Sequence, residues 1–190
     1  MKIAEGDYYN FYEKVKAMNE KDATEVFLIY NLSPIIVKIK PASTITFKKG
    51  SNIYIGWIRY GKSFLNDLGL NILTLKENSK ISVSLIYNED LLKEAIGGND
   101  EKKFLINIGY DNELKLNSIL QTLRERCINL TCPHELGLFL GIPLNDVIDF
   151  IESKKKCVFN GYWKVYSDVD RSIQIFNEYD RVKSIVIDLI

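Results

Sequence analysis

The chain has 190 residues, 46% of them hydrophobic and 26% charged, which is enough apolar content for one globular domain over residues 1–190. Its lysines and arginines balance its aspartates and glutamates at a formal net charge of zero. We therefore expect neither nucleic acid nor an anionic membrane as a partner. No apolar run approaches the roughly 20 residues that a membrane-spanning helix requires.

The start of the chain and the cysteines predict a cytoplasmic protein. Residues 1–7 lack the apolar core of a signal peptide. Cys127, Cys132 and Cys157 are an odd number of thiols, which is more typical of a reducing compartment than of a disulfide framework. Together with His134 they offer ligands for zinc, but no two cysteines have the close spacing of a structural zinc site. The sequence therefore predicts no metal site.

The N-terminal quarter of the chain predicts two helices followed by two short strands. Apolar residues at helical spacing predict a helix over 7–19 and a second one over 22–32, with the aspartate at 22 as its N-cap. Pro34 should end the second helix, because the residue before a proline disfavours the helical conformation. A strand over 35–39 should follow, and then either a short strand or an extended link at 45–47.

The middle of the chain predicts a mixture of helices and strands. Aromatic and apolar residues at helical spacing predict an amphipathic helix over 57–68. Strands are expected over 72–75 and 81–87, the second rich in β-branched residues. Short helices should follow over 89–96 and 101–108.

The C-terminal third is mostly helical by the same criteria. We expect helices over 112–130, 133–140 and 143–153, then a strand over 158–166, and a last helix that Asp168 caps. Helices outnumber strands and do not alternate regularly with them. The sequence therefore predicts a mixed α+β fold with a small central β-sheet covered by several helices and a helix-rich C-terminal half.

A phosphate-binding loop is suggested by Gly56–Ser63, which fits the pattern GxxxxGK[ST]. In such a loop Lys62 would contact the outer phosphates of a nucleotide and Ser63 the magnesium ion. The bulky residues between the two glycines would hinder a tight turn around an anion, and the apolar stripe of the predicted helix continues through Gly61. Nucleotide binding at Gly56–Ser63 is therefore the less favoured alternative to a plain amphipathic helix.

The segment Cys132-Pro133-His134-Glu135 holds the chain's single histidine next to a thiol and a carboxylate. Pro133 suits the first position of a helix, which would make Cys132 the cap and would place Glu135 in the first turn. A thiol at the positive end of a helix dipole ionises more readily, and imidazole there tends to stay neutral. The segment is either a reactive or ligand-binding site, with Cys132, His134 and Glu135 as candidates, or a well-capped helix.

The two short helices predicted over 133–140 and 143–153 superficially resemble a helix-turn-helix. Contact with DNA requires cationic side chains that neutralise phosphates. Residues 131–153 contain no lysine or arginine but several carboxylates. We therefore exclude a DNA-recognition helix in this segment.

An aromatic face is predicted for the strand that contains Gly-Tyr-Trp-Lys-Val-Tyr at 161–166. Alternation along a strand places Tyr162 and Tyr166 on one face and Trp163 on the other. One face must belong to the core. The other could contact a flat cofactor or a partner, which makes Tyr162, Trp163 and Tyr166 candidate cofactor-binding residues.

Two long motifs resemble the signature of the clostridial family of domains of unknown function numbered 3793. They are Cys-Pro-His-Glu-x-Gly-x-Phe-Leu-Gly-x-Pro-x-x-Asp-Val-x-x-Phe-Ile over 132–151 and Gly-Tyr-Trp-Lys-Val-Tyr-x-Asp over 161–168. The segments 33–47 and 85–88 resemble further parts of the family. The resemblance implies a cytosolic protein of an anaerobic member of the Firmicutes, in a genomic setting of iron- and flavodoxin-related genes, and it implies no established activity.

These observations favour a binding or accessory protein without chemistry of its own, tied to redox or iron metabolism. Zero net charge, free thiols and the lack of a paired acid–base constellation support this interpretation. The alternative is an enzyme or cofactor-binding protein that uses the Cys132-His134-Glu135 segment. The ligand or protein partner is not specified by either interpretation.

Overall fold

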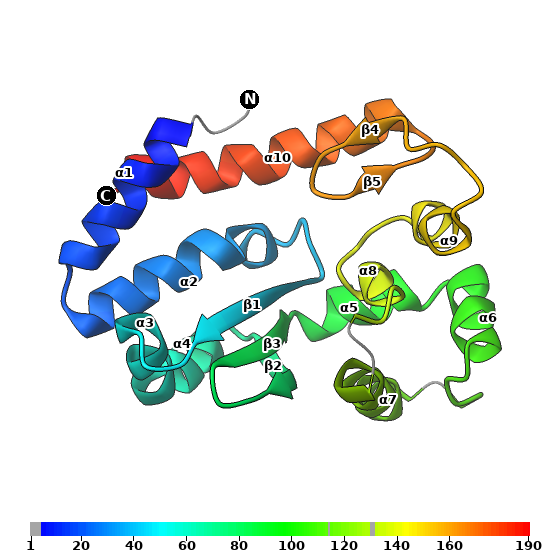
Figure 1. Ribbon diagram of the computed structural model, residues 1–190, viewed down its shortest axis with the longest axis horizontal. Coiled ribbons are helices and arrows are strands. Elements are labelled where there is room, and N and C mark those ends of the chain that lie inside the picture. The colour runs from blue at the N-terminus through cyan, green and yellow to red at the C-terminus, as the bar shows by residue number, and fades with distance from the viewer. Residues whose placement is uncertain (1–4, 114, 130–131) are drawn as a thin grey trace.

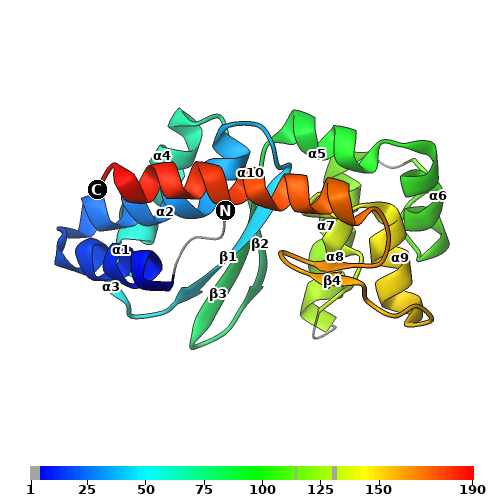
Figure 2. The same ribbon diagram turned by 90° about the horizontal axis from the view of Figure 1, so that it is seen from above.

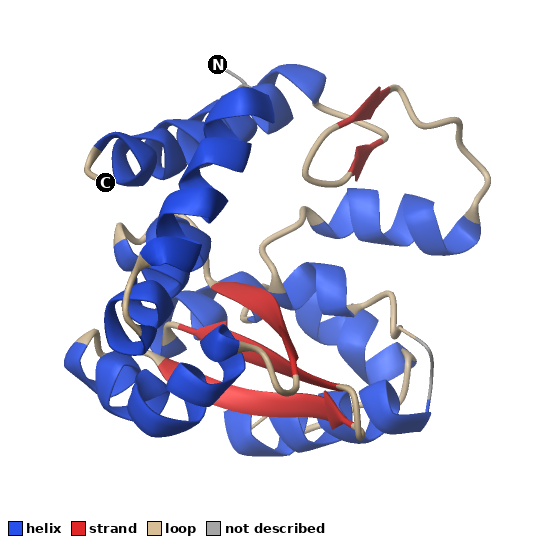
Figure 3. Ribbon diagram, turned by 60° about the vertical axis from the view of Figure 1, so that its left-hand side comes forward, coloured by secondary structure: helices blue, strands red, loops and turns tan. Residues whose placement is uncertain are grey.

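A three-stranded antiparallel sheet lies at the centre of the fold, between two groups of helices (Figures 1 and 3). The computed structural model describes residues 5–113, 115–129 and 132–190. The strands β1 (Ala42–Lys48), β2 (Asn71–Glu77) and β3 (Ile81–Tyr87) have the order β1-β3-β2. The central strand β3 is hydrogen-bonded on both edges, and its apolar residues alternate between two cores, one on each face of the sheet.

One face of the sheet packs against α2 (Glu20–Ile36), α3 (Asn52–Gly56) and α4 (Lys62–Asp67). Its core contains Phe47 of β1 and Ile86 of β3. The other face contributes Leu85 and Tyr87 to a larger core with α5 (Glu89–Ile96), α6 (Asn99–Asn107), α7 (Leu116–Asn129) and α8 (Leu136–Phe139). The mixed α+β fold predicted from the sequence is confirmed, as is its helix-rich C-terminal half.

The last helix, α10 (Val169–Asp188), connects the two ends of the molecule (Figures 1 and 2). Its C-terminal part packs against α1 (Glu5–Ala17) and α2, where Val186 joins the core around Phe11. Its N-terminal part packs Phe176 and Tyr179 against a hairpin formed by β4 (Phe159–Asn160) and β5 (Lys164–Val165). The hairpin is thereby held by the same helix that ties the N-terminal helices together. No helix in the described ranges is both long and apolar enough to cross a bilayer.

The prediction that Pro34 ends the second helix is wrong, because α2 continues to Ile36. Proline lacks the N–H group that would bond the carbonyl of Tyr30 one turn earlier. The Ser33 hydroxyl donates to that carbonyl at 3.1 Å instead, so the carbonyl keeps a partner. The chain then turns at Lys38, whose φ is 63°, and the strand predicted over 35–39 does not form.

The strand predicted over 158–166 is also wrong, since this segment forms the hairpin β4–β5. Gly161 lies in the turn, where a Cβ atom would come within 2.2 Å of the Phe176 ring. Trp163 and Val165 are buried and Tyr162 is exposed, but Tyr162 and Trp163 both pack against Phe176, so the strict alternation of faces predicted for a strand does not hold. The last helix begins after Asp168 as predicted, and the Asp168 side chain accepts a hydrogen bond from the Arg171 N–H.

Most of the other predicted elements are present with shifted ends. The helix predicted over 112–130 is α7, which begins only at Leu116, and residue 130 lies outside the described residues. The predicted N-cap of the second helix is displaced, because Asn19 accepts the capping hydrogen bond from the N–H of Asp22. The strands β2 and β3 and the helices α5 and α6 occupy the expected parts of the sequence.

The phosphate-loop pattern does not form a loop. Residues 56–63 are helical throughout, as the end of α3, a π-helical turn η1 (Trp57–Gly61) and the start of α4. Gly56 lies against α2, where a Cβ atom would be 2.0 Å from Thr24 Oγ1 and 2.9 Å from the Glu20 carbonyl oxygen. The glycine therefore serves helix packing, and the backbone cannot wrap around a phosphate here.

Replacing Gly56 with alanine should lower the free energy of unfolding by about 1–3 kcal/mol, because α3 must move away from α2. Ser63→Ala, at an exposed position of α4, is the matched control and should stay within about 0.5 kcal/mol of the wild type. Urea unfolding monitored by circular dichroism measures both values. Equal stability of the two variants would contradict the packing role of Gly56. If magnesium and ATP stabilised the wild type against heat and Ser63→Ala abolished that effect, the segment would bind a nucleotide after all.

Candidate functional site

A cavity of about 450 Å³ lies between α8, α9 (Leu144–Glu152) and the hairpin. We call it the slot. Apolar side chains form most of its wall, and they come from segments that are distant in sequence. The slot is lined by Cys132, Pro133, His134, Leu136, Gly137, Leu140, Ile142, Asp146, Val147, Phe150, Trp163 and Lys164.

The hairpin wall of the slot is held by the carboxylate of Asp146, which is 2% exposed. Its Oδ2 accepts a hydrogen bond from Trp163 Nε1 at 2.9 Å, and its Oδ1 accepts from the backbone N–H groups of Tyr166 at 2.9 Å and Ser167 at 3.2 Å. Hydrogen bonds to a charged acceptor are among the stronger ones in proteins. Asp146 thus joins α9 to the hairpin and fixes the indole of Trp163, whose ring also packs edge-on against Phe176.

Polar side chains gather at the mouth of the slot. Cys132 and His134 are both exposed. The imidazole of His134 packs edge-on against Phe150 at a centroid distance of 5.0 Å, and Lys164 Nζ lies 5.4 Å from the same phenyl ring. A thiol, an imidazole and an ammonium group therefore surround the entrance to an apolar cavity.

Glu135 does not take part in this arrangement. Its carboxylate is 3% exposed, forms a salt bridge with Arg126 of α7 and accepts a hydrogen bond from the Tyr110 hydroxyl at 3.3 Å. Arg126 also donates to the carbonyl of Ile108. Burial, together with the negative charge of Glu135, raises the pKa of Tyr110, which keeps its hydroxyl protonated. Glu135 anchors the turn before α8 to α7, so Cys132, His134 and Glu135 do not form one constellation.

The capping role predicted for Cys132 is wrong, because α8 begins only at Leu136 and has four residues. The preceding turn is tight, with N–H groups of residues 136, 137 and 138 bonded to carbonyls three positions earlier. A helix dipole acts within the first turn of a regular helix. The proposed activation of the thiol by a helix starting at Pro133 therefore has no structural basis.

The three aromatic candidates have different surroundings. Trp163 lines the slot. The Tyr162 hydroxyl donates to Asp180 of α10 at 2.7 Å, away from the slot, and the Tyr166 backbone is bound to Asp146. The aromatic strand therefore offers one ring to the slot rather than a continuous aromatic face.

The candidate zinc ligands do not come together. Burial raises the pKa of the Cys127 thiol to about 11, and Cys157 Sγ donates to the Phe159 carbonyl at 3.0 Å. Within the ranges that the structure describes, no three side chains of histidine, cysteine, aspartate or glutamate are placed to hold a metal ion.

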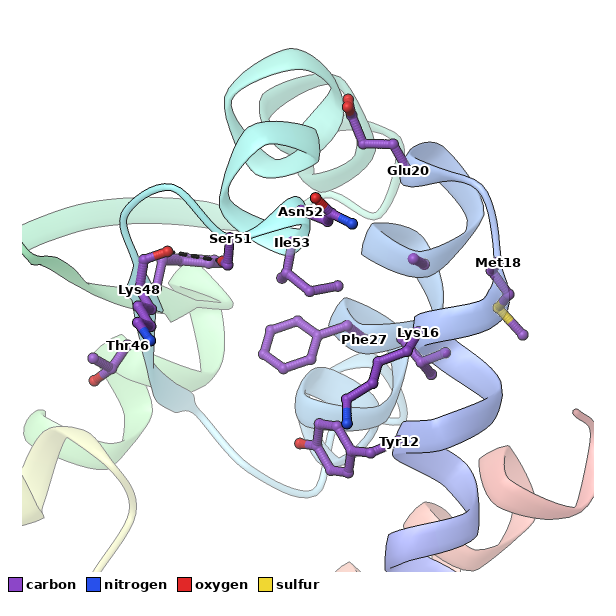
Figure 4. Close-up of a pocket in the computed structure, with 13 residues that line it drawn as sticks. Tyr12, Lys16, Met18, Glu20, Phe27, Thr46, Lys48, Ser51, Asn52 and Ile53 are labelled. Carbon is purple, nitrogen blue, oxygen red and sulfur yellow. Dashed lines mark hydrogen bonds between the residues drawn. The ribbon is translucent and has the colours of Figure 1, made fainter.

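A second cavity of about 400 Å³ lies between α1, α2, β1 and α3 (Figure 4). Phe27 and Ile53 point into it, with Tyr12 and Lys16 on one side and Lys48 on the other. None of the residues proposed from the sequence as a site lines this cavity.

Asp146 and Lys164 are polar residues of the slot that sequence analysis did not propose as site residues. Asp146 entered the sequence analysis as one of the carboxylates that argue against DNA binding and as a position of the family motif, but not as a site residue. Asp149, paired with Lys155, is buried on the same helix. The available signal for Asp146 was its position between Leu144 and Val147, on the inward face of the predicted helix. A carboxylate at such a position needs donors from elsewhere in the fold.

Asp146→Ala should lower the free energy of unfolding by about 3 kcal/mol, because the Trp163 indole and the backbone N–H groups of Tyr166 and Ser167 lose a charged acceptor. Asn145→Ala, on the exposed side of the same helix, is the control and should change it by less than about 0.5 kcal/mol. Chemical denaturation followed by circular dichroism gives both values, and tryptophan fluorescence reports release of the indole. A similar stability of the two variants would show that the hairpin does not depend on this carboxylate.

Comparison with known proteins identified a family but no characterised relative. No curated protein and no solved structure matches the chain. The family model described as a protein of unknown function, DUF3793, matches residues 28–190. The matched segment includes every residue that lines the slot. The residues of α1 and α2 that line the second cavity lie before residue 28, outside the match. The chain therefore belongs to the DUF3793 family of proteins of unknown function.

Proposed function

We propose that the protein is a ligand-binding protein and that its binding site is the slot between α8, α9 and the hairpin. The observation that carries the proposal is the convergence of Cys132, His134, Trp163 and Lys164 on one apolar cavity of about 450 Å³. Sites for small molecules commonly have volumes of roughly 300–1,000 Å³, apolar walls and a few polar groups. The slot meets each of these criteria.

The walls favour a ligand with an apolar, planar body. Leu136, Leu140, Ile142 and Val147 provide aliphatic surface, and Trp163 provides an aromatic ring. The indole is fixed by Asp146 and Phe176, so little side-chain entropy is lost when a ligand packs against it. A rigid aromatic wall is well suited to a flat ring system.

The mouth favours an anionic group on that ligand. Lys164 forms no salt bridge with any carboxylate of the described residues, and its ammonium group lies next to the Phe150 ring, which His134 also contacts. The carboxylate that lines the slot, Asp146, already accepts hydrogen bonds from the Trp163 indole, from two backbone N–H groups and from the Ser167 hydroxyl. The charge available to a ligand at the entrance is therefore positive.

An enzyme that uses Cys132 as a nucleophile is the second candidate, because its thiol and the imidazole of His134 line the same mouth. A catalytic base is usually oriented by a third polar group. In the described part of the chain, the ring of His134 contacts Phe150 and no carboxylate lies within salt-bridge distance of it. This arrangement favours binding over catalysis.

The fluorescent probe 8-anilinonaphthalene-1-sulfonate, which has flat rings and an anionic group, should bind the slot. Phe150→Ala removes a ring from the mouth and should weaken binding about tenfold. Ile151→Ala is the matched control, because Ile151 is a similarly exposed apolar residue of the same helix that does not line the slot. Fluorescence titration gives the dissociation constants. Equal values for the two variants would place the bound probe elsewhere.

Lys164→Gln separates the contribution of charge from that of the walls. This substitution should weaken binding of the sulfonate probe severalfold and leave binding of N-phenyl-1-naphthylamine, the neutral analogue, unchanged. A loss of both probes would indicate that the hairpin has been disturbed, and unchanged binding of both would contradict the proposed anion preference.

An anaerobic preparation tests the link to redox or iron metabolism that the family resemblance suggests. Absorbance spectrum, metal content and intact mass should together show a ligand that denaturation releases from an unmodified chain. A covalent adduct on Cys132 would favour the enzyme instead. A colourless, metal-free ligand would contradict the redox or iron assignment and leave the binding proposal standing.

A further inference from the structure

A group of lysines and tyrosines lies next to the hairpin, outside the slot. Lys40, in the link between α2 and β1, has its Nζ 5.4 Å from the ring centroid of Tyr179. Lys183 of α10 has its Nζ 4.9 Å from the ring centroid of Tyr162 and 5.5 Å from that of Tyr30. We call these five residues the lysine–tyrosine cluster. They come from α2, the following link, the hairpin and α10, so the tertiary fold assembles them.

The cluster carries an excess of positive charge. In the part of the chain that the structure describes, no carboxylate lies within salt-bridge distance of Lys40 or Lys183. The carboxylate nearby is Asp180, which accepts the hydrogen bond from the Tyr162 hydroxyl. Burial raises the pKa of Tyr30 and of Tyr179 to about 12, so these tyrosines add no negative charge. The cluster therefore holds two ammonium groups, and Asp180, the carboxylate that acts on Lys183, already has a donor.

The excess charge is only partly solvated. Burial, and then the charge of Lys183, lower the pKa of Lys40 to about 8. Burial also lowers the pKa of Lys183, although Asp180 opposes this effect. A partly buried charge without an ionic partner is unfavourable, and a bound counter-ion relieves the cost. Cation–π contacts with the tyrosine rings compensate only in part.

We propose that the lysine–tyrosine cluster binds an oxyanion, the phosphate or carboxylate group of a small molecule, between Lys40 and Lys183. Ammonium groups are strong donors to such oxygens. The aromatic rings of Tyr162 and Tyr179 position the two lysines. The site is independent of the proposed slot function, since Tyr162 belongs to the cluster while its neighbour Trp163 lines the slot.

Isothermal titration with inorganic phosphate and with acetate, at constant ionic strength maintained with chloride, tests the proposal. The wild type should bind one of the two anions, and the preferred anion identifies the ligand group. Lys40→Met and Lys183→Met should each weaken binding at least tenfold. Lys102→Met, at an exposed position of α6, removes the same charge and should leave binding unchanged.

The same variants show whether folding is affected. Lys40→Met should be at least as stable as the wild type in chloride near neutral pH, because it removes a charge that burial disfavours. Binding of acetate should weaken from about pH 7 to about pH 9, as Lys40 loses its proton. Over this range the other charged groups at the site are Lys183 of the cluster and the neighbouring Asp180, and the ring of Tyr8 packs against that of Tyr30. Binding of neither anion by the wild type, or undiminished binding by both cluster variants, would overturn the proposal.

Discussion

The carboxylate of Asp146 is the interaction on which the candidate site depends. Two strands of two residues each cannot form a stable hairpin alone. The hairpin persists because Asp146 accepts hydrogen bonds from the Trp163 indole and from two backbone N–H groups, and because α10 covers its other side. These donors also offset the cost of burying the carboxylate. The hydrogen bonds of Asp146 thus hold the hairpin in place and, with it, one wall of the slot.

The hairpin divides its residues between two environments. Trp163 and Lys164 face the slot, whereas Tyr162 faces α10 and the lysine–tyrosine cluster. Since α10 packs against both the hairpin and the N-terminal helices, it also brings together Tyr162 and Tyr179, the two neighbouring rings that Lys183 and Lys40 contact. A ligand in either site would therefore contact elements that α10 holds in place. Glu135 has the corresponding role on the other side of the slot, where it ties the turn before α8 to Arg126.

Much of the fold could be predicted from the sequence, because long amphipathic helices and alternating strands leave periodic patterns. The errors occurred where one side chain changed the local preference. The Ser33 hydroxyl supplies the hydrogen bond that Pro34 cannot, so α2 continues. Gly161 lets the chain turn against Phe176, so the expected strand becomes a hairpin. Neither effect has a periodic signature.

The candidate site was predictable only in part, for a related reason. Cys132, His134 and Trp163 stood out by residue type, and the fold places all three around one cavity. Glu135 also stood out, but a carboxylate that a distant arginine neutralises looks the same in sequence as one at an active site. Asp146 was missed because its donors follow about twenty residues later, and only the folded chain brings them together.

The most direct test of this account is the indole N–H signal of Trp163 in a two-dimensional ¹H–¹⁵N spectrum, assigned with the help of a Trp57→Phe variant. Trp57 is packed on Phe47 in the other core and serves as the internal reference. Titration with 8-anilinonaphthalene-1-sulfonate should shift the Trp163 signal and leave the Trp57 signal in place. A shift of Trp57 alone, or of neither indole despite measurable binding, would show that the slot is not the binding site.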